Sequence, residues 1–179
     1  MENPTEGDEA YYDALGKGGK SRVLDHKTFK QPLRSIGLRA SVILREDTTV
    51  AAAITAMRAA KIGSVLVTHK EGGLTGIFTE RDALNQLALG ELDPRKTPLS
   101  AVMHDRPESL TLDDGIGYAL RIMSHGGYRH VPLVDKDGRP VGVVSVRDIV
   151  DFIADHFPDD ILTLPTDPRS TIAKSSEGA

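Results

Sequence analysis

One seven-residue segment occurs twice in the chain. Gly76-Ile-Phe-Thr-Glu-Arg-Asp82 recurs as Gly142-Val-Val-Ser-Val-Arg-Asp148, so a glycine, a hydroxyl, an arginine and an aspartate each return after 66 residues. The same ungapped shift aligns further identical pairs on both sides: Pro32/Pro98, Leu33/Leu99, Leu44/Leu110, Asp47/Asp113, Met57/Met123 and Gly72/Gly138. We call two residues that lie 66 positions apart register partners. The register predicts two copies of one structural unit, over residues 31–90 and 97–157.

Each unit is small. A domain of about 60 residues buries only about 60% of the surface that its unfolded chain exposes, so one unit alone would be marginally stable. The two units are therefore expected to pack on each other, with residues 91–96 as the linker. Residues 1–30 and 158–179 are polar and predict a flexible N-terminal arm and a loose C-terminal tail. In the alternative, the arm docks on a neighbouring subunit through Tyr11, Tyr12 and Phe29.

Composition argues against several classes of function. The 22 Lys and Arg residues are scattered and the net charge is −4, so neither nucleic acid nor an anionic membrane is an expected partner. No apolar run approaches the roughly 20 residues that span a bilayer, and the N-terminus is acidic where a signal peptide would be basic. The absence of cysteine excludes disulfides and thiolate sites, and the six histidines show no ligand spacing that would predict a metal. A soluble, cytoplasmic protein is expected.

Hydrophobic periodicity predicts the same order of elements in both units. In the first, a strand over 41–44 precedes a helix over 48–60 capped by Asp47, a hairpin of strands 64–68 and 74–78, and a helix that begins after Thr79. In the second, a short helix over 99–103 precedes a strand near 108–111, a helix from Asp113, strands 129–134 and 141–144, and a helix over 145–156. Gly115 and Gly117 weaken that first long helix by about 1 kcal/mol each, which indicates close approach by another backbone.

The repeated segment suggests a nucleotide site. Thr79 and Ser145 fall where a strand passes into a helix, and the free N–H groups of a helix N-terminus, with its positive dipole end, attract anions such as phosphate. Asp82 and Asp148 follow one turn later, where a carboxylate can accept hydrogen bonds from the vicinal diol of a ribose. The alternative is that Thr or Ser with Asp three residues later only starts a helix, since duplication copies structural residues too.

The two units resemble a tandem pair of cystathionine-β-synthase (CBS) domains, the arrangement called a Bateman module. The similarity covers residues 31–157 and includes Ile62-Gly-Ser-Val-Leu-Val67 and Tyr128-Arg-His-Val-Pro-Leu133. It implies an α+β fold of two β-α-β-β-α repeats packed with pseudo-two-fold symmetry. It also implies a regulatory or sensory module whose two clefts accept an adenosine-containing ligand: AMP, ADP or ATP, with NAD or S-adenosylmethionine as further possibilities.

The resemblance also assigns candidate ligand-binding residues. It places the ribose-binding carboxylates at Asp82 and Asp148 and the neighbouring hydroxyls at Thr79 and Ser145. It implies that each cleft borrows a strand from the opposite repeat to hold adenine. The borrowed residues are Arg129, His130 and Val131 at the Asp82 cleft, and Ile62, Gly63, Ser64 and Val65 at the Asp148 cleft. A further threonine of the family falls on Thr48, near the Asp148 cleft.

The two clefts are expected to differ. Arg129 and His130 offer charge to phosphates, whereas their register partners Gly63 and Ser64 offer none, and the register partner of Thr48 is the acidic Asp114. The Asp82 cleft is therefore expected to suit phosphates better, and the Asp148 cleft the nucleoside end. In the alternative, Arg129 and His130 are a surface pair that merely flanks a strand.

The sequence favours a module without catalytic activity. Ser145 has no paired base in its motif, and the chain has no G-x-S-x-G segment. Regulation would then act in trans on an unknown client protein, through a ligand with different affinities for two states. The resemblance implies a disc-like homodimer with contacts on helices 48–60 and 147–156. The alternative is a dimerisation or protein-interaction scaffold with relic clefts that bind no ligand.

Overall fold

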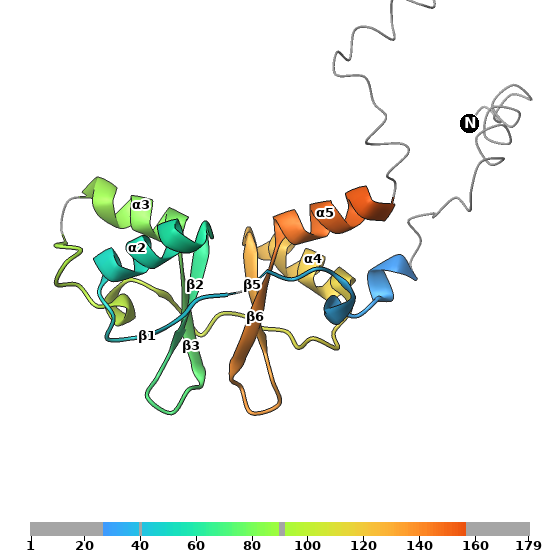
Figure 1. Ribbon diagram of the computed structural model, residues 1–179, viewed down its shortest axis with the longest axis horizontal. Helices are drawn as coiled ribbons and strands as arrows, with labels where there is room; N and C mark the ends of the chain where they lie inside the picture. The colour runs from blue at the N-terminus through green and yellow to red at the C-terminus, as the bar shows by residue number, and fades with distance from the viewer. Residues whose placement is uncertain (1–26, 40, 90–91, 157–179) are drawn as a thin grey trace, which may run out of the picture.

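A computed structural model describes residues 27–39, 41–89 and 92–156, which form two similar halves side by side (Figure 1). The first half contains β1 (Ile43–Arg45), α2 (Val50–Ala60), β2 (Ser64–Thr68), β3 (Leu74–Thr79) and α3 (Glu80–Leu89). The second contains η3 (Leu99–Ala101), β4 (His104–Asp105), α4 (Ile116–Gly126), β5 (His130–Val134), β6 (Pro140–Ser145) and α5 (Val146–His156). Two 3₁₀ turns, η1 (Thr28–Lys30) and η2 (Leu33–Ser35), precede both. The expected α+β class with two related repeats is confirmed.

The two sheets differ in size. The first has the order β1-β2-β3-β4, with β1 parallel to β2 and the other pairs antiparallel, whereas β5 and β6 form a two-stranded antiparallel sheet. The strand expected near 108–111 is reduced to an isolated bridge between Leu110 and Leu133. Pro107, which precedes it, has no N–H to donate to a ladder. The chain before this proline instead supplies β4, which adds to the sheet of the first half and was not predicted.

Two predicted helix starts are wrong. Thr49, rather than Asp47, caps α2: its side-chain oxygen accepts a hydrogen bond from the Ala52 N–H at 3.3 Å. The Asp47 carboxylate is bound instead by Arg45, at 3.2 Å from its Nε. In the second half Gly115 is the N-cap of α4, not Asp113. Several hydroxyl and carboxylate residues precede each helix, so propensity alone does not select the one that caps it.

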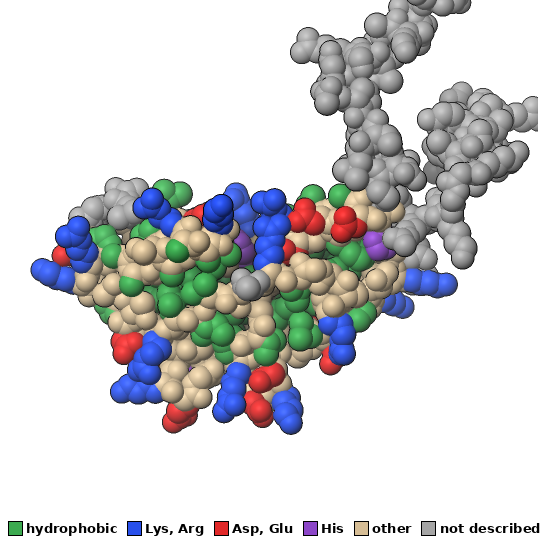
Figure 2. Space-filling view, viewed as in Figure 1, with side chains coloured by type: hydrophobic (Ala, Val, Ile, Leu, Met, Phe, Trp, Pro, Cys, Tyr) green, Lys and Arg blue, Asp and Glu red, His purple; other side chains and the backbone are tan. Residues whose placement is uncertain are grey.

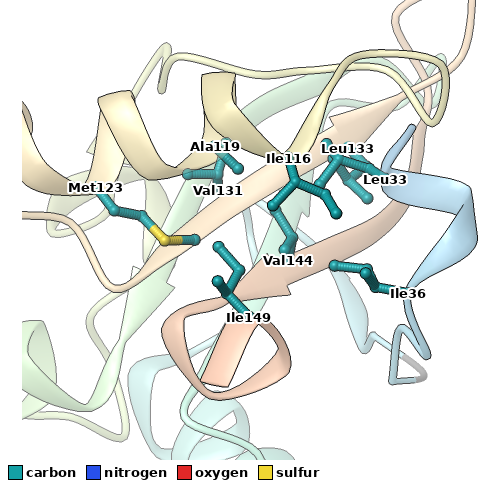
Figure 3. Packing of buried hydrophobic residues seen from close by; sticks show 9 residues of the cluster. All are labelled: Leu33, Ile36, Ile116, Ala119, Met123, Val131, Leu133, Val144 and Ile149. Carbon is teal, nitrogen blue, oxygen red and sulfur yellow. The ribbon is translucent and has the colours of Figure 1, made fainter. Parts of the chain in front are cut away.

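Each half has its own hydrophobic core, and the flanking segments are exchanged between the cores. Leu33 and Ile36 lie at the start of the first repeat but pack in the core of the second, with Ile116, Leu133 and Val144 (Figure 3). Leu99 lies at the start of the second repeat but packs in the core of the first, with Val50, Val65 and Phe78. Leu33 N–H donates to the Asp114 carbonyl and Leu99 N–H to the Thr48 carbonyl, both at 2.8 Å.

The last residues of the expected arm are ordered against the second half. η1 packs on α4, and a Cβ added to Gly115 or Gly117 would lie only 3.1 or 3.3 Å from the Phe29 carbonyl oxygen. The close backbone approach expected from these two glycines is therefore confirmed. Phe29 was a candidate for contact with a neighbouring subunit, but it packs against the core of the second half of its own chain. Residues 1–26, with Tyr11 and Tyr12, and the expected tail over 158–179 lie outside the described residues.

The two register-partner glycines of the repeated segment differ in the space around them. A Cβ on Gly76 would lie 3.0 Å from the His104 carbonyl oxygen, because β4 pairs there, whereas a Cβ on Gly142 would meet only the Leu133 side chain, at 3.7 Å. Gly76→Ala is therefore expected to lower the free energy of unfolding by about 1–3 kcal/mol. Gly142→Ala should change it by less than about 1 kcal/mol. Urea unfolding of both variants measures the contrast, and equal losses would contradict it.

Candidate functional site

The two hairpins meet at the boundary between the halves. Along β2 and β3, Val65, Val67 and Phe78 point into the core of the first half, so by strand alternation Leu66 and Ile77 point to the opposite face. Both are buried, although neither belongs to that core. Figure 1 shows β5 and β6 beside this face. Two cavities open at the boundary, and each is lined by residues from both halves.

Each repeated segment forms a reciprocal cap at the start of its helix. Asp82 Oδ2 accepts hydrogen bonds from the Thr79 N–H (2.9 Å) and hydroxyl (2.7 Å), while the Asp82 N–H donates to the Thr79 hydroxyl oxygen (3.3 Å). Asp148 and Ser145 repeat this pattern at 2.7, 2.6 and 3.3 Å. The segment therefore does start a helix, as the structural alternative predicts. Each cap uses only the Oδ2 oxygen of its carboxylate.

The larger cavity lies beside Asp148 and has a volume of about 500 Å³. We call it the Asp148 cavity. Ser145, Asp148 and neighbours from β6 and α5 form one side. Ile62 and Gly63, in the loop between α2 and β2, and Ser64, the first residue of β2, come from the other half. This volume falls in the range of small-molecule sites, about 300–1,000 Å³. The cavity therefore has room for a ligand of nucleotide size.

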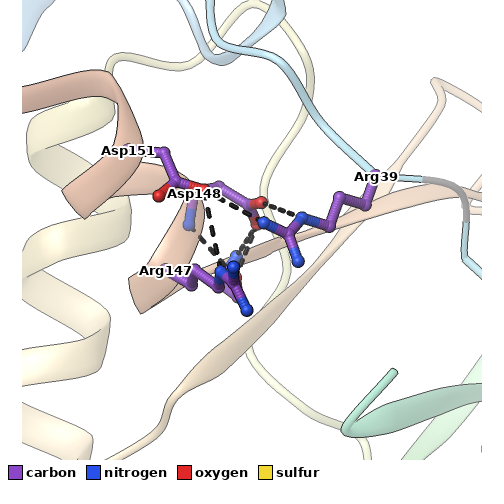
Figure 4. A network of polar contacts seen from close by, with 5 residues as sticks. Arg39, Arg147, Asp148 and Asp151 are labelled. Atoms are coloured by element: carbon purple, nitrogen blue, oxygen red, sulfur yellow. Dashed lines mark hydrogen bonds and ion pairs between the residues drawn. The ribbon is translucent and has the colours of Figure 1, made fainter. Parts of the chain in front are cut away.

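The Asp148 carboxylate is buried in the wall of this cavity. The residue is 5% exposed, and its Oδ1 has no hydrogen-bond partner among the described residues. Arg39 Nε lies 3.5 Å from Oδ1, and Arg39 Nη2 donates to Asp151 Oδ2 at 3.0 Å (Figure 4). Arg147 Nε lies 3.8 Å from the same Asp151 oxygen. A buried carboxylate oxygen without a hydrogen bond is costly, so Oδ1 is available to a donor from a ligand.

The smaller cavity lies beside Asp82 and has a volume of about 170 Å³. We call it the Asp82 cavity. It is lined by Thr79 and Asp82 from the first half and by the loop before β5 from the second. His104 and Tyr128 also line it, with their ring centroids 5.5 Å apart. Arg81 Nη1 reaches across to the Gly127 carbonyl at 3.5 Å. The repeat thus produces two related but unequal cavities.

Most of the sequence-predicted site residues line these cavities. Ser145, Asp148, Ile62 and Ser64 line the Asp148 cavity, Thr79 and Asp82 line the Asp82 cavity, and Gly63, Arg129 and His130 line both. Three others line neither cavity. Val65 and Val131 point into the two cores, and Thr48 lies before α2, where its carbonyl accepts the Leu99 N–H.

The distribution of charge departs from the sequence-based expectation. Arg39, Lys61 and Arg147 add cations to the Asp148 cavity, which was expected to suit the nucleoside end. Asp114, expected to repel phosphate, accepts hydrogen bonds from the N–H and hydroxyl of Thr111 and lines neither cavity. Sequence reasoning missed Arg39 because it lies in an aperiodic segment before β1. Arg147, by contrast, is the register partner of Arg81 and could have been found from the repeat.

His130 lies between the two cavities. Loss of hydration on burial lowers the pKa of its imidazole, and Arg129 lowers it further, while the charges of Asp148 and Glu80 raise it. Burial is the largest of these effects, so the folded protein favours neutral His130.

The free energy of unfolding should therefore fall as pH drops. An unfolded histidine binds its proton near pH 6.5, before the folded one does, so stability is complete above that pH and is lost as pH falls toward the lower folded pKa. We expect His130→Gln to lose less stability than the wild type between about pH 7.5 and 5.5. Urea unfolding at both pH values measures this difference. Equal losses in the two proteins would contradict the assignment.

Comparison with known proteins places this architecture in a class. A pair of β-α-β-β-α repeats with cavities at their boundary is the arrangement of tandem CBS domains, and the CBS domain family model matches residues 33–89 and 99–155. The chain belongs to the CBS domain family. An uncharacterized 17.7 kDa protein of Acidianus ambivalens is 29% identical over 113 residues, which span 63% of this chain and 67% of that protein. A CBS domain-containing protein of Arabidopsis thaliana is 42% identical over 76 residues, only 14% of its length.

Solved structures show the same fold. A CBS-domain containing protein from Agrobacterium tumefaciens is 30% identical with a TM-score of 0.58, and the match covers 64% of this chain and 90% of that one. A CBS domain protein from Pyrobaculum aerophilum, solved in complex with AMP, is 27% identical with a TM-score of 0.61. The match covers 65% of this chain and 88% of that one. In the part of this chain that is described, no helix has the length and apolar character to cross a membrane.

Proposed function

We propose that this protein is a regulatory module that binds an adenine nucleotide, of the AMP, ADP or ATP type, between its two CBS repeats. The observation that carries the proposal is the buried Asp148 Oδ1, which has no hydrogen bond from the described residues and belongs to a side chain that lines a cavity of about 500 Å³. A ribose diol would supply the missing donors. The complex of the Pyrobaculum aerophilum protein with AMP supports this ligand class for the present chain.

The proposed ligand would contact the predicted site from both repeats. Asp148 and Ser145 would hold the sugar end, and the segment of Ile62, Gly63 and Ser64 would cover the base. Thr79, Asp82, Arg129 and His130 would form the second, smaller site. Because both sites draw on both repeats, a bound ligand would fix the position of one repeat relative to the other. That coupling is the physical basis for a regulatory signal.

The proposed module has no catalytic role of its own and acts in trans on a client protein. Ligand binding would shift an equilibrium between two states of the module, and the client would respond to one of them. A homodimer is the assembly that we propose. Val150 on α5, one of the two helices expected at the contact, is 55% exposed. Its register partner Leu84 on α3 is 67% exposed, so we propose α3, in place of the expected helix 48–60, as the second helix of the interface. The same exposure favours the second candidate function, a ligand-free scaffold for association.

A thermal-shift panel separates the two functions. We expect AMP, ADP or ATP at 100 times its Kd to raise the free energy of unfolding by about 2.7 kcal/mol, because only the folded state binds it. NAD and S-adenosylmethionine complete the panel, and guanosine monophosphate serves as the control for the base. An unchanged melting temperature with every adenosine compound would contradict nucleotide binding and leave the scaffold.

A further inference from the structure

The two cavities carry different charge although they arise from the same repeat. The Asp148 cavity is lined by Arg39, Lys61, Arg129 and Arg147 against one carboxylate, a formal net charge of +3 with neutral histidine. The Asp82 cavity is lined by Arg81 and Arg129 against Glu80 and Asp82, and is formally neutral. Figure 2 shows Lys and Arg side chains gathered between the two halves on the face in view. Only the Asp148 cavity therefore attracts a multiply charged anion.

Two exchanges between register partners contribute to this difference. Val146 lines the Asp148 cavity, whereas its register partner Glu80 lines the Asp82 cavity, so the Asp148 cavity has one negative charge fewer. Lys61 lines the Asp148 cavity where its partner Gly127 lines the other, which adds a positive charge. Arg39 adds a third contribution from outside the repeated segments.

Lys61 occupies a backbone position that favours glycine. It ends α2 in the left-handed region, with φ 53° and ψ 44°, and Gly127 ends α4 in the same region, with φ 66° and ψ 18°. Glycine adopts this conformation without the steric conflict that a Cβ brings, and is the usual residue there. The first repeat thus has a strained lysine where the second has the ordinary residue. Such strain is often found at functional sites.

Lys61 is also a cation without a competing partner. Arg39 and Arg147 are paired with Asp148 and Asp151. Within the described ranges, no carboxylate lies in ion-pair distance of Lys61 or Arg129. The two unpaired cations line the same cavity from opposite halves. A chain of phosphates bound there would be neutralised from both sides.

We propose that Lys61 is a specificity-determining residue that makes the Asp148 cavity select nucleoside di- and triphosphates over uncharged nucleosides and sulfonium cations. This proposal rests on the proposed function. Each added phosphate brings charge into a cavity of formal charge +3, whereas S-adenosylmethionine brings a positive sulfur into it. The order of affinity is therefore ATP, ADP, AMP, adenosine, with the sulfonium compound disfavoured.

The test is calorimetric titration of the wild type and Lys61→Gly with ATP, AMP, adenosine and S-adenosylmethionine. Lys61→Gly restores the residue of the second repeat in a conformation that suits glycine, so the variant is expected to fold. We expect ATP affinity to fall about tenfold and adenosine affinity to change less than about twofold, because one charge-assisted contact is lost. Higher ionic strength should weaken wild-type binding of ATP but not of adenosine.

Two control variants sharpen the result. Lys136→Gly makes the same chemical change at an exposed turn residue that lines neither cavity, and should leave every affinity unchanged. Lys61→Arg retains the charge and should keep the preference for ATP. The selectivity proposal is overturned if Lys61→Gly weakens adenosine as much as ATP, or leaves ATP unaffected. It is also overturned, with the proposed function intact, if the wild type binds AMP as tightly as ATP. Failure of all four compounds to bind the wild type would overturn both.

Discussion

Replacing Asp148 by asparagine is expected to weaken adenosine and AMP binding by about 10- to 100-fold with little loss of stability. The amide oxygen of asparagine can take the place of Oδ2 and accept from the Ser145 N–H, so the start of α5 is kept. The amide nitrogen then replaces Oδ1, which has no hydrogen bond in the folded protein, and the small loss of stability comes from the ion pair between Oδ1 and the half-exposed Arg39, which is lost as well. A nitrogen donor cannot accept from a ribose diol, and a hydrogen bond to a charged acceptor contributes about 1.5–3 kcal/mol.

Calorimetric titration with adenosine measures this effect, and urea unfolding of the same variant checks the fold. Asp114→Asn is the matched control, because Asp114 accepts hydrogen bonds from the N–H and hydroxyl of Thr111 in the same pattern but lines neither cavity. Alanine is a poorer choice at Asp148. It would also remove the cap, which costs about 0.5–2 kcal/mol, and would mix binding with stability. Unchanged adenosine affinity in Asp148→Asn would refute the role of Oδ1.

Phe78→Ala is expected to produce the largest loss of stability, about 3–5 kcal/mol. Phe78 is fully buried in β3 and packs in the core of the first half, with Val50, Val65 and Leu99. Its removal leaves a cavity that this core cannot easily close, because residues of both α2 and α3 pack in the same core. Phe78→Leu retains most of the volume and should cost less than half as much.

Urea unfolding followed by circular dichroism measures the loss. We expect one transition in the wild type, since Leu99 and Leu33 tie each core to the opposite repeat. A loss below about 1.5 kcal/mol for Phe78→Ala would mean that the site repacks around the missing ring. Two separate transitions would show that the halves unfold independently.

The fold was largely predictable because the duplication doubles each local signal. Short apolar runs bounded by turn residues located the two hairpins to within about a residue, and the period of the helices located their core faces. The paired aspartates were also found from the repeat alone. Helix caps were less predictable, since Asp47, Thr48 and Thr49 are all suitable residues and tertiary contacts decide among them.

Other features depend on long-range contacts that no local pattern encodes. Leu33 and Leu99 each read as the first apolar residue of their own repeat, yet each is buried in the other core. Arg39 reaches Asp148 from a segment without periodicity. Lys61 has a left-handed backbone conformation, which a lysine in the sequence does not predict, although its register partner is a glycine. Arg39 and Lys61 account for much of the difference between the expected and observed sites.

The exchange of flanking segments limits how this chain can be divided. A fragment that contains only one repeat would keep a leucine that packs in the other core and would lack the leucine that completes its own. The two residues are Leu33 and Leu99. A single repeat transferred into an unrelated gene would therefore have a core that lacks one of its buried leucines. The pair of repeats is the smallest portable piece.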